Sequence, residues 1–120
     1  MCGTLKHSHW TSKDPIRVGS MFPDGTEIFI EGKKLEVPAK WNGFARDDQL
    51  EKWKEHGWKE GFLKVDSFTE KDHEFEVPAG KVIKVVALNK SPRPINIVTT
   101  EATKEQKKVH HRWPMFIDKE

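Results

Sequence analysis

Short apolar segments separated by proline- and glycine-containing turns constrain the fold of this chain more than any other feature. The clearest are Glu27–Ile30, Val82–Leu88 and Ile95–Thr99, and turns such as Pro23–Gly25 and Pro78–Gly80 stand between such segments. Short apolar runs bounded by turn residues are typical of β-strands. We therefore expect a domain built mostly of strands.

Other segments fit the same description. Lys34–Val37 is predicted to form a hairpin with Glu27–Ile30, and further strands are expected at Phe62–Val65, Glu74–Val77 and Met115–Ile117. Two short helices are predicted. The first begins at Asp47 or Asp48, turns Leu50 and Trp53 toward the protein, and ends at Gly57. The second runs from Thr100 to Val109, with acidic residues near its start and lysines near its end. The predicted fold class is α+β, in one small domain covering residues 1–120.

Composition limits the functional classes. The chain has 120 residues, which suits one domain, and its net charge of +2 neither requires nor excludes a nucleic-acid partner. No apolar run approaches the roughly 20 residues of a membrane helix, and no signal peptide is apparent. The single cysteine cannot form an internal disulfide, which suits a reducing compartment. We expect a monomer without membrane contact, in the cytoplasm near the nucleoid, or in the host-cell cytoplasm if the chain is viral.

That cysteine is Cys2, in the opening Met1-Cys2-Gly3. Removal of Met1, which a small second residue favours, would place an α-amine and a thiol on one carbon. These groups titrate near ~8 and ~8.5, so both are partly nucleophilic at neutral pH. The amine can form a Schiff base with an aldehyde, and the thiol can close that imine into a thiazolidine. Attack of the thiol on an acyl group and an unimportant tail position remain open alternatives.

The histidines raise the question of a metal site. His7 and His9 alternate in His-Ser-His, so on a strand both would face one side, and Cys2 would make a third ligand. No cysteine pair and no His-x₃-His spacing supports structural zinc, so we expect no metal and no cofactor. Asp47 and Asp48 are interpreted as a helix start and not as a catalytic carboxylate pair.

Four segments together resemble the family of SOS-response-associated peptidases. They are Met1-Cys2-Gly3, Ala45–Asp48, Val65–Glu70, and the C-terminal stretch from Ile95 to Pro114 that contains Thr99-Thr100-Glu101-Ala102 and Val109-His110-His111-Arg112-Trp113-Pro114. At the second segment the family has Asn-Ala-Arg-x-Glu-Thr, and at the third it has Pro-Ala-Asp-Gly-Phe-Tyr-Glu. In the C-terminal stretch it has Thr-Thr-x-Ala followed by Ile-His-x-Arg-Met-Pro. The matches occur in family order and span nearly the whole chain. The resemblance implies a mostly antiparallel open barrel with two short helices.

The resemblance also implies an activity. Members of this family shield abasic sites in single-stranded DNA by forming a thiazolidine crosslink through the mature N-terminal cysteine, and they remove their own initiator methionine. Carried over to this chain, Cys2 would supply the amine and the thiol, Glu70 would handle the amine proton, and His110 would assist opening of the abasic sugar. Arg46 and Arg112 would contact phosphates.

This chain departs from the family pattern at the DNA-contacting positions. Phe44 stands where the family has asparagine, and Asn42, two residues earlier, is a candidate replacement. Trp113 stands where methionine or arginine is usual and is predicted to offer a base-stacking surface. The DNA-binding set expected from the sequence is therefore Arg46, Asn42, Phe44, Arg112 and Trp113.

Two further functions stay open. One is a domain of the same type that binds DNA without crosslinking it, because the DNA-contacting positions differ. The other is an N-terminal-nucleophile amidotransferase, whose glutaminase domain also begins Met-Cys-Gly, although further substrate-holding motifs of that group are not found here.

Overall fold

The computed structural model describes residues 3–8, 10, 14–35, 38–70, 73–90 and 92–118. Within them the chain forms strands and very little helix. The strands are β1 (Thr4–Lys6), β2 (Glu27–Ile30), β3 (Lys33–Lys34), β4 (Ala39–Arg46), β5 (Lys59–Lys64), β6 (Ser67–Glu70), β7 (His73–Glu76), β8 (Lys81–Ala87), β9 (Arg93–Glu101), β10 (Arg112–Pro114) and β11 (Phe116–Asp118). The α-helix is α1 (Leu50–Glu55), and 3₁₀ turns cover Asp47–Gln49 (η1) and Gln106–Lys108 (η2).

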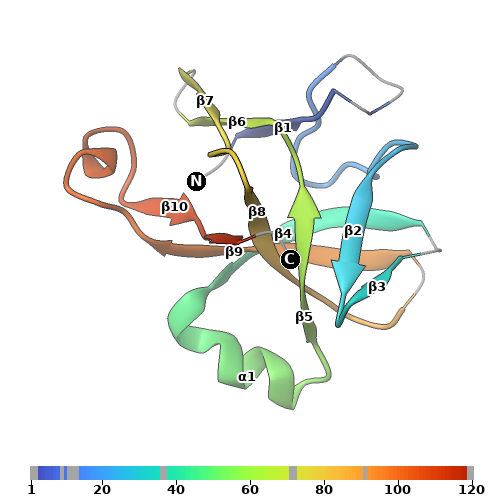
Figure 1. The fold of residues 1–120 in the computed structure, drawn as a ribbon. Helices are drawn as coiled ribbons and strands as arrows, with labels where there is room; N and C mark the ends of the chain where they lie inside the picture. Colours follow the sequence, from blue (N-terminus) through green and yellow to red (C-terminus); the bar gives the residue numbers. More distant parts are fainter. Residues whose placement is uncertain are drawn as a thin grey trace.

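The strands form two sheets (Figure 1). The larger has the order β10-β9-β8-β5-β2-β3, with β4 parallel to β9 and β11 antiparallel to β8. The smaller sheet has the order β1-β6-β7. In the part of the chain that the structure describes, the strand pairing does not close either sheet into a barrel.

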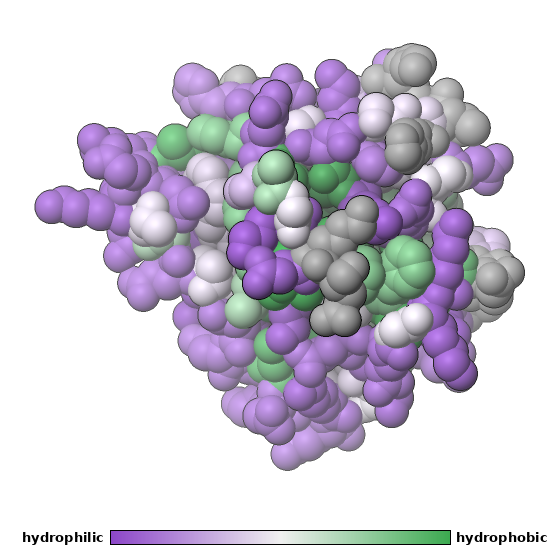
Figure 2. Space-filling view, in the orientation of Figure 1, coloured by the Kyte–Doolittle hydropathy of each residue, from purple (hydrophilic) through white to green (hydrophobic). Residues whose placement is uncertain are grey.

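Strands β8 and β9 lie at the centre of the larger sheet, and hydrophobic side chains cover both of their faces. Ile83 and Val85 belong to the main hydrophobic core, whereas Val86 and Val98 belong to a second cluster. Leu50 and Trp53 of the η1–α1 segment cover that second cluster. Strands buried on both faces are continuous apolar runs, which is how Val82–Leu88 and Ile95–Thr99 appear in the sequence. Hydrophilic side chains cover most of the outer face seen in Figure 2.

Much of the predicted secondary structure is confirmed. The hairpin of β2 and β3 pairs Phe29 with Lys34 and Ile30 with Lys33. The first helix begins at Asp47 as a 3₁₀ turn, continues as α1, and is followed by Gly57 with a φ of 91°, a conformation that favours glycine. The predicted far end of the hairpin, at Val37, lies outside the described residues.

The predicted helix from Thr100 to Val109 is wrong. Thr100 and Glu101 continue β9, where they pair with Trp113 and Arg112 of β10. Only η2 remains helical. Before it, the backbone N–H of Thr103 donates to the Gln106 side chain at 2.9 Å, and the backbone N–H of Gln106 donates to Thr103 Oγ1 at 3.2 Å. Pairing with β10 therefore outweighs the charge pattern that favours a helix.

Candidate active site

Glu70 is the last residue of β6, the central strand of the smaller sheet. Its neighbours β1 and β7 hold the strand in register, with Thr69 opposite Thr4 and Glu70 opposite His73. The exposed fraction of Glu70 is 0%. A buried carboxylate is costly unless other groups stabilise its charge, so a glutamate at this position indicates a specific role.

The described chain begins beside Glu70. The backbone N–H of Gly3 donates to the Thr69 carbonyl at 2.6 Å, and the hydroxyls of Thr4 and Thr69 lie 2.7 Å apart. A Cβ added to Gly3 would lie 3.2 Å from Thr69 Oγ1, so the backbone approaches β6 closely. The predicted nucleophile Cys2 precedes Gly3 in the sequence and lies outside the described residues.

His110 lies in the loop between η2 and β10, and its ring is held by the backbone of Arg112. Nδ1 is 3.1 Å from the Arg112 N–H and 3.2 Å from the Arg112 carbonyl oxygen. A neutral ring accepts from that N–H through Nδ1, and a protonated ring donates to the carbonyl. The Arg112 backbone therefore offers a hydrogen-bond partner to both the neutral and the protonated His110 ring. This arrangement suits a residue that takes up and releases a proton.

The electrostatic surroundings link His110 to Glu70. Burial lowers the pKa of His110 below its usual value, while the negative charge of Glu70 acts in the opposite direction. The ring is therefore mainly neutral at pH 7 and able to accept a proton. The structure thus brings together the two predicted proton-handling residues, which lie forty residues apart in the sequence, counted from 70 to 110.

Arg112 is fixed within the protein by a network that the sequence did not reveal. Its Nη2 donates to Asp47 Oδ1 at 3.1 Å, and its Nε donates to Thr99 Oγ1 at 3.3 Å. Thr100 Oγ1 donates to Asp47 Oδ2 at 2.8 Å. The Arg112 side chain is only 13% exposed. Its guanidinium therefore connects β10 to β9 and η1, and the predicted phosphate contact at Arg112 would have to compete with these bonds.

The candidates on β4 differ in their exposure. Arg46 is exposed and forms two hydrogen bonds with Asp48, at 3.1 Å each. Asn42 is exposed and donates to Asn96 Oδ1 at 3.2 Å. Phe44 is half-buried, and its ring centroid lies 5.9 Å from that of Trp41. Of these three residues, Arg46 and Asn42 present polar groups to solvent.

The prediction of a stacking surface at Trp113 is corrected by its burial. The side chain is 4% exposed and belongs to the main core. Its ring meets Phe68 and Phe75 edge-on, with centroids 5.5 Å and 5.0 Å away. An indole in this position fills the space between the two sheets, so its faces are not available to a nucleobase.

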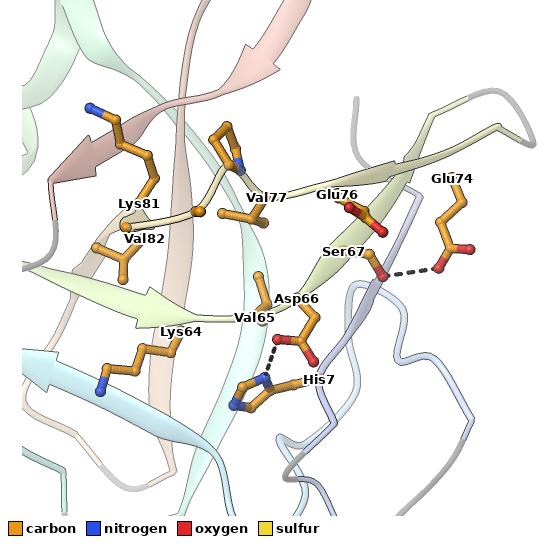
Figure 3. Close-up of a pocket in the computed structure, with 13 residues that line it drawn as sticks. His7, Lys64, Val65, Asp66, Ser67, Glu74, Glu76, Val77, Lys81 and Val82 are labelled. Carbon is orange, nitrogen blue, oxygen red and sulfur yellow. Dashed lines mark hydrogen bonds and ion pairs between the residues drawn. The ribbon is translucent and has the colours of Figure 1, made fainter.

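A cavity of about 600 Å³ lies between the smaller sheet and the turn that joins β7 to β8 (Figure 3). His7 Nδ1 is 3.2 Å from Asp66 Oδ1, and Ser67 Oγ donates to Glu74 at 2.9 Å, in both cases on its wall. His7, considered above as a metal ligand, therefore pairs with a carboxylate. Within the described residues, which omit Cys2 and His9, no three His, Cys, Asp or Glu side chains are grouped to hold a metal ion.

No family model, curated protein or solved structure matches this chain. Among the described residues, no helix is long and apolar enough to cross a membrane. A fold alone does not determine function, so the functional argument depends on the site residues themselves.

Proposed function

We propose that this chain captures abasic sites in single-stranded DNA covalently through Cys2, after removal of Met1. The observation that carries the proposal is that fully buried Glu70 lies within electrostatic range of His110, while Gly3 is hydrogen-bonded to Thr69, the residue before Glu70. The hydrogen bond from Gly3 to Thr69 therefore tethers the residue that follows Cys2 beside β6.

The chemistry needs only groups that the chain and its substrate supply. The α-amine of Cys2 adds to the aldehyde of the ring-opened abasic sugar, and loss of one water gives an imine. The thiol then adds to the imine carbon, and its proton passes to the nitrogen. The product is a thiazolidine, formed with the net loss of one water and with no oxidant or reductant.

The two carried-over residues have separate roles in this proposal. Glu70 accepts the proton of the α-ammonium group, so that the amine can attack. His110 moves the proton needed to open the sugar ring, and its contact with the Arg112 backbone suits both of its protonation states. Positioned acids and bases of this kind contribute typically about 10²- to 10⁴-fold to a rate.

The remaining parts of the proposal concern the DNA and the protein's surroundings. Exposed Arg46 and Asn42 contact the DNA strand near the lesion, and Arg46 exchanges its bonds to Asp48 for bonds to a phosphate. We propose a monomer acting in the cytoplasm, with the two sheets arranged as the open barrel that the resemblance implies.

The test is crosslinking on a denaturing gel. Purified protein with a verified free Cys2 is mixed with a single-stranded oligonucleotide carrying one abasic site, and the rate of the shifted band is measured. Cys2→Ser is expected to abolish the band. Glu70→Gln and His110→Asn are expected to slow it by about 10²-fold or more. The matched controls are Glu76→Gln on neighbouring β7 and His56→Asn at the end of α1, both at exposed residues, and neither should change the rate.

Absence of a covalent band with free Cys2 overturns the proposal. Binding on a native gel without that band would favour the non-crosslinking DNA-binding domain, and glutaminase activity would favour the amidotransferase. Equal slowing by Glu70→Gln and Glu76→Gln would remove the role assigned to Glu70.

A further inference from the structure

A cleft of about 500 Å³ at the edge of the larger sheet gathers positive charge. Among the residues that the structure describes, its charged lining comprises Lys33, Lys34, Lys59 and Arg93, with Glu31 as the one carboxylate. Four cations against one anion is a local excess in a chain whose net charge is only +2. A concave surface lined by one sign of charge focuses its field on ligands of the opposite sign.

Strand register places three of these cations on one face of the sheet. Lys33 is opposite Ile30, and Lys59 is opposite Ala87, both of which belong to the main core. Arg93 precedes a buried core isoleucine of β9 by two residues and therefore shares its face. The three side chains thus stand where the core-facing side of the sheet opens to solvent.

A tight turn and a close approach of two strands fix the backbone around the cleft. Glu31 and Gly32 have φ angles of 50° and 83°, the pattern of a tight two-residue hairpin turn between β2 and β3. On β5, a Cβ added to Gly61 would lie 2.0 Å from the Phe29 carbonyl oxygen, so only glycine allows β2 and β5 to approach this closely. The lysines are therefore presented on fixed strands.

These four cations differ from neighbouring lysines in their pairing. Lys64 pairs with Glu27 at 2.8 Å, and Lys84 pairs with Glu60 at 2.6 Å. No ion pair links Lys33, Lys34, Lys59 or Arg93 to any carboxylate of residues 3–8, 10, 14–35, 38–70, 73–90 and 92–118. Lys34 contributes to lowering the pKa of Glu27, so the charges of Lys33, Lys59 and Arg93 are the ones available to an external anion.

The cleft is remote from the candidate active site. Arg93 begins β9, and β10, which follows His110, pairs with the other end of that strand (Figure 1). Eight steps along the nine residues of β9 span about 26 Å. A stacked nucleic-acid strand advances about 3.4 Å per nucleotide, so this separation corresponds to about 8 nucleotides.

We propose that this basic cleft binds the phosphate backbone of a single nucleic-acid strand, at a second contact point beside the start of β9, whose other end pairs with the β10 strand that follows His110. The cleft goes beyond the proposed crosslinking, because backbone binding needs neither Cys2 nor an abasic site. Strands that reach both points bind through both, and shorter strands do not.

The experiment uses the full chain with Cys2→Ser, so that no covalent product contributes and the result does not depend on the proposed reaction. Anisotropy of labelled oligothymidylates of about 4 and about 16 nucleotides gives affinity between about 50 and 200 mM salt. Lys33→Gln/Lys59→Gln is compared with Lys52→Gln/Lys104→Gln, which removes the same charge from exposed lysines outside the cleft.

Each phosphate contact on a single strand contributes about 0.7 to the slope of log affinity against log salt. The cleft variant is therefore expected to lower that slope by about 1.4 on the longer strand. The control variant should match the parent on both. Circular dichroism checks that each variant is folded, and Arg93→Gln alone should lower the slope by about 0.7.

Several results would overturn this inference. Equal losses in the cleft and control variants would mean that net charge alone drives binding. An unchanged slope on the longer strand would mean that the cleft does not touch phosphates. Binding of an acidic polypeptide such as polyglutamate, with the same dependence on Lys33 and Lys59, would identify a protein partner instead.

Discussion

Asp47→Asn is the substitution that best tests how the loop carrying His110 is held. The carboxylate accepts from Arg112 Nη2 at 3.1 Å and from Thr100 Oγ1 at 2.8 Å, and the Arg112 side chain is 13% exposed. Asparagine keeps the shape but loses the charge. Hydrogen bonds to charged groups contribute about 1.5–3 kcal/mol, and Arg112 keeps its bonds to Thr99, so we expect a loss of about 2 kcal/mol.

The free energy of unfolding by urea measures this loss. With a slope of about 1–3 kcal/mol per molar urea for small proteins, the midpoint should fall by roughly 1 M. Asp48→Asn is the matched control, because Asp48 also pairs with an arginine at 3.1 Å but both side chains are 57% exposed. Its midpoint should equal that of the parent, since exposed pairs contribute little. Equal midpoints for Asp47→Asn and the parent would refute the network.

Three further predictions concern the burial of Trp113, the close approach of strands at Gly61, and the ionisation of Asp47. Trp113→Ala should cost about 3–5 kcal/mol in urea unfolding, because its ring fills the core; a cost under about 1 kcal/mol would restore it as a surface residue. Gly61→Ala should lower the melting temperature, because the new Cβ would meet the Phe29 carbonyl oxygen at 2.0 Å; unchanged melting would contradict that close approach. Burial alone would raise the pKa of Asp47, but hydrogen bonds from Thr100 and Arg112 lower it. Its stabilisation is therefore present above about pH 4 and lost as the pH falls further, so acid should narrow the gap between parent and Asp47→Asn in urea midpoints.

Local sequence patterns predicted the parts of the fold that local chemistry decides. The β2–β3 hairpin depends on the Glu31-Gly32 turn, and the runs in β8 and β9 are apolar because both faces are buried. The end of the first helix follows from Gly57, whose φ is 91°, whereas its start has no side-chain cap, because the Asp47 carboxylate bonds Thr100 and Arg112.

Contacts between distant segments decided what the sequence could not predict. Thr100 pairs with Trp113 in a strand, so the acidic and basic residues that favour a helix in this segment have no decisive effect. Asp47 and Arg112 are 65 positions apart, and nothing near either residue signals their bond. The burial of Trp113 depends on Phe68 and Phe75 in the smaller sheet.

In the candidate site, too, the sequence predicted the residues but not the contacts that hold them. The motifs that predict Glu70 and His110 lie far apart in the chain, and the structure brings the two residues within electrostatic range of each other. The partners that hold His110 were not predicted, because they are backbone groups of Arg112 whose positions follow from the β9–β10 pairing.

The most direct test of the central claim is the intact mass of the product formed with an abasic oligonucleotide. The proposed reaction predicts the mass of the chain without Met1 plus that of the oligonucleotide, less one water. The product should be absent with Cys2→Ser. A product that retains Met1, or one that forms equally well with Cys2→Ser, would contradict the account.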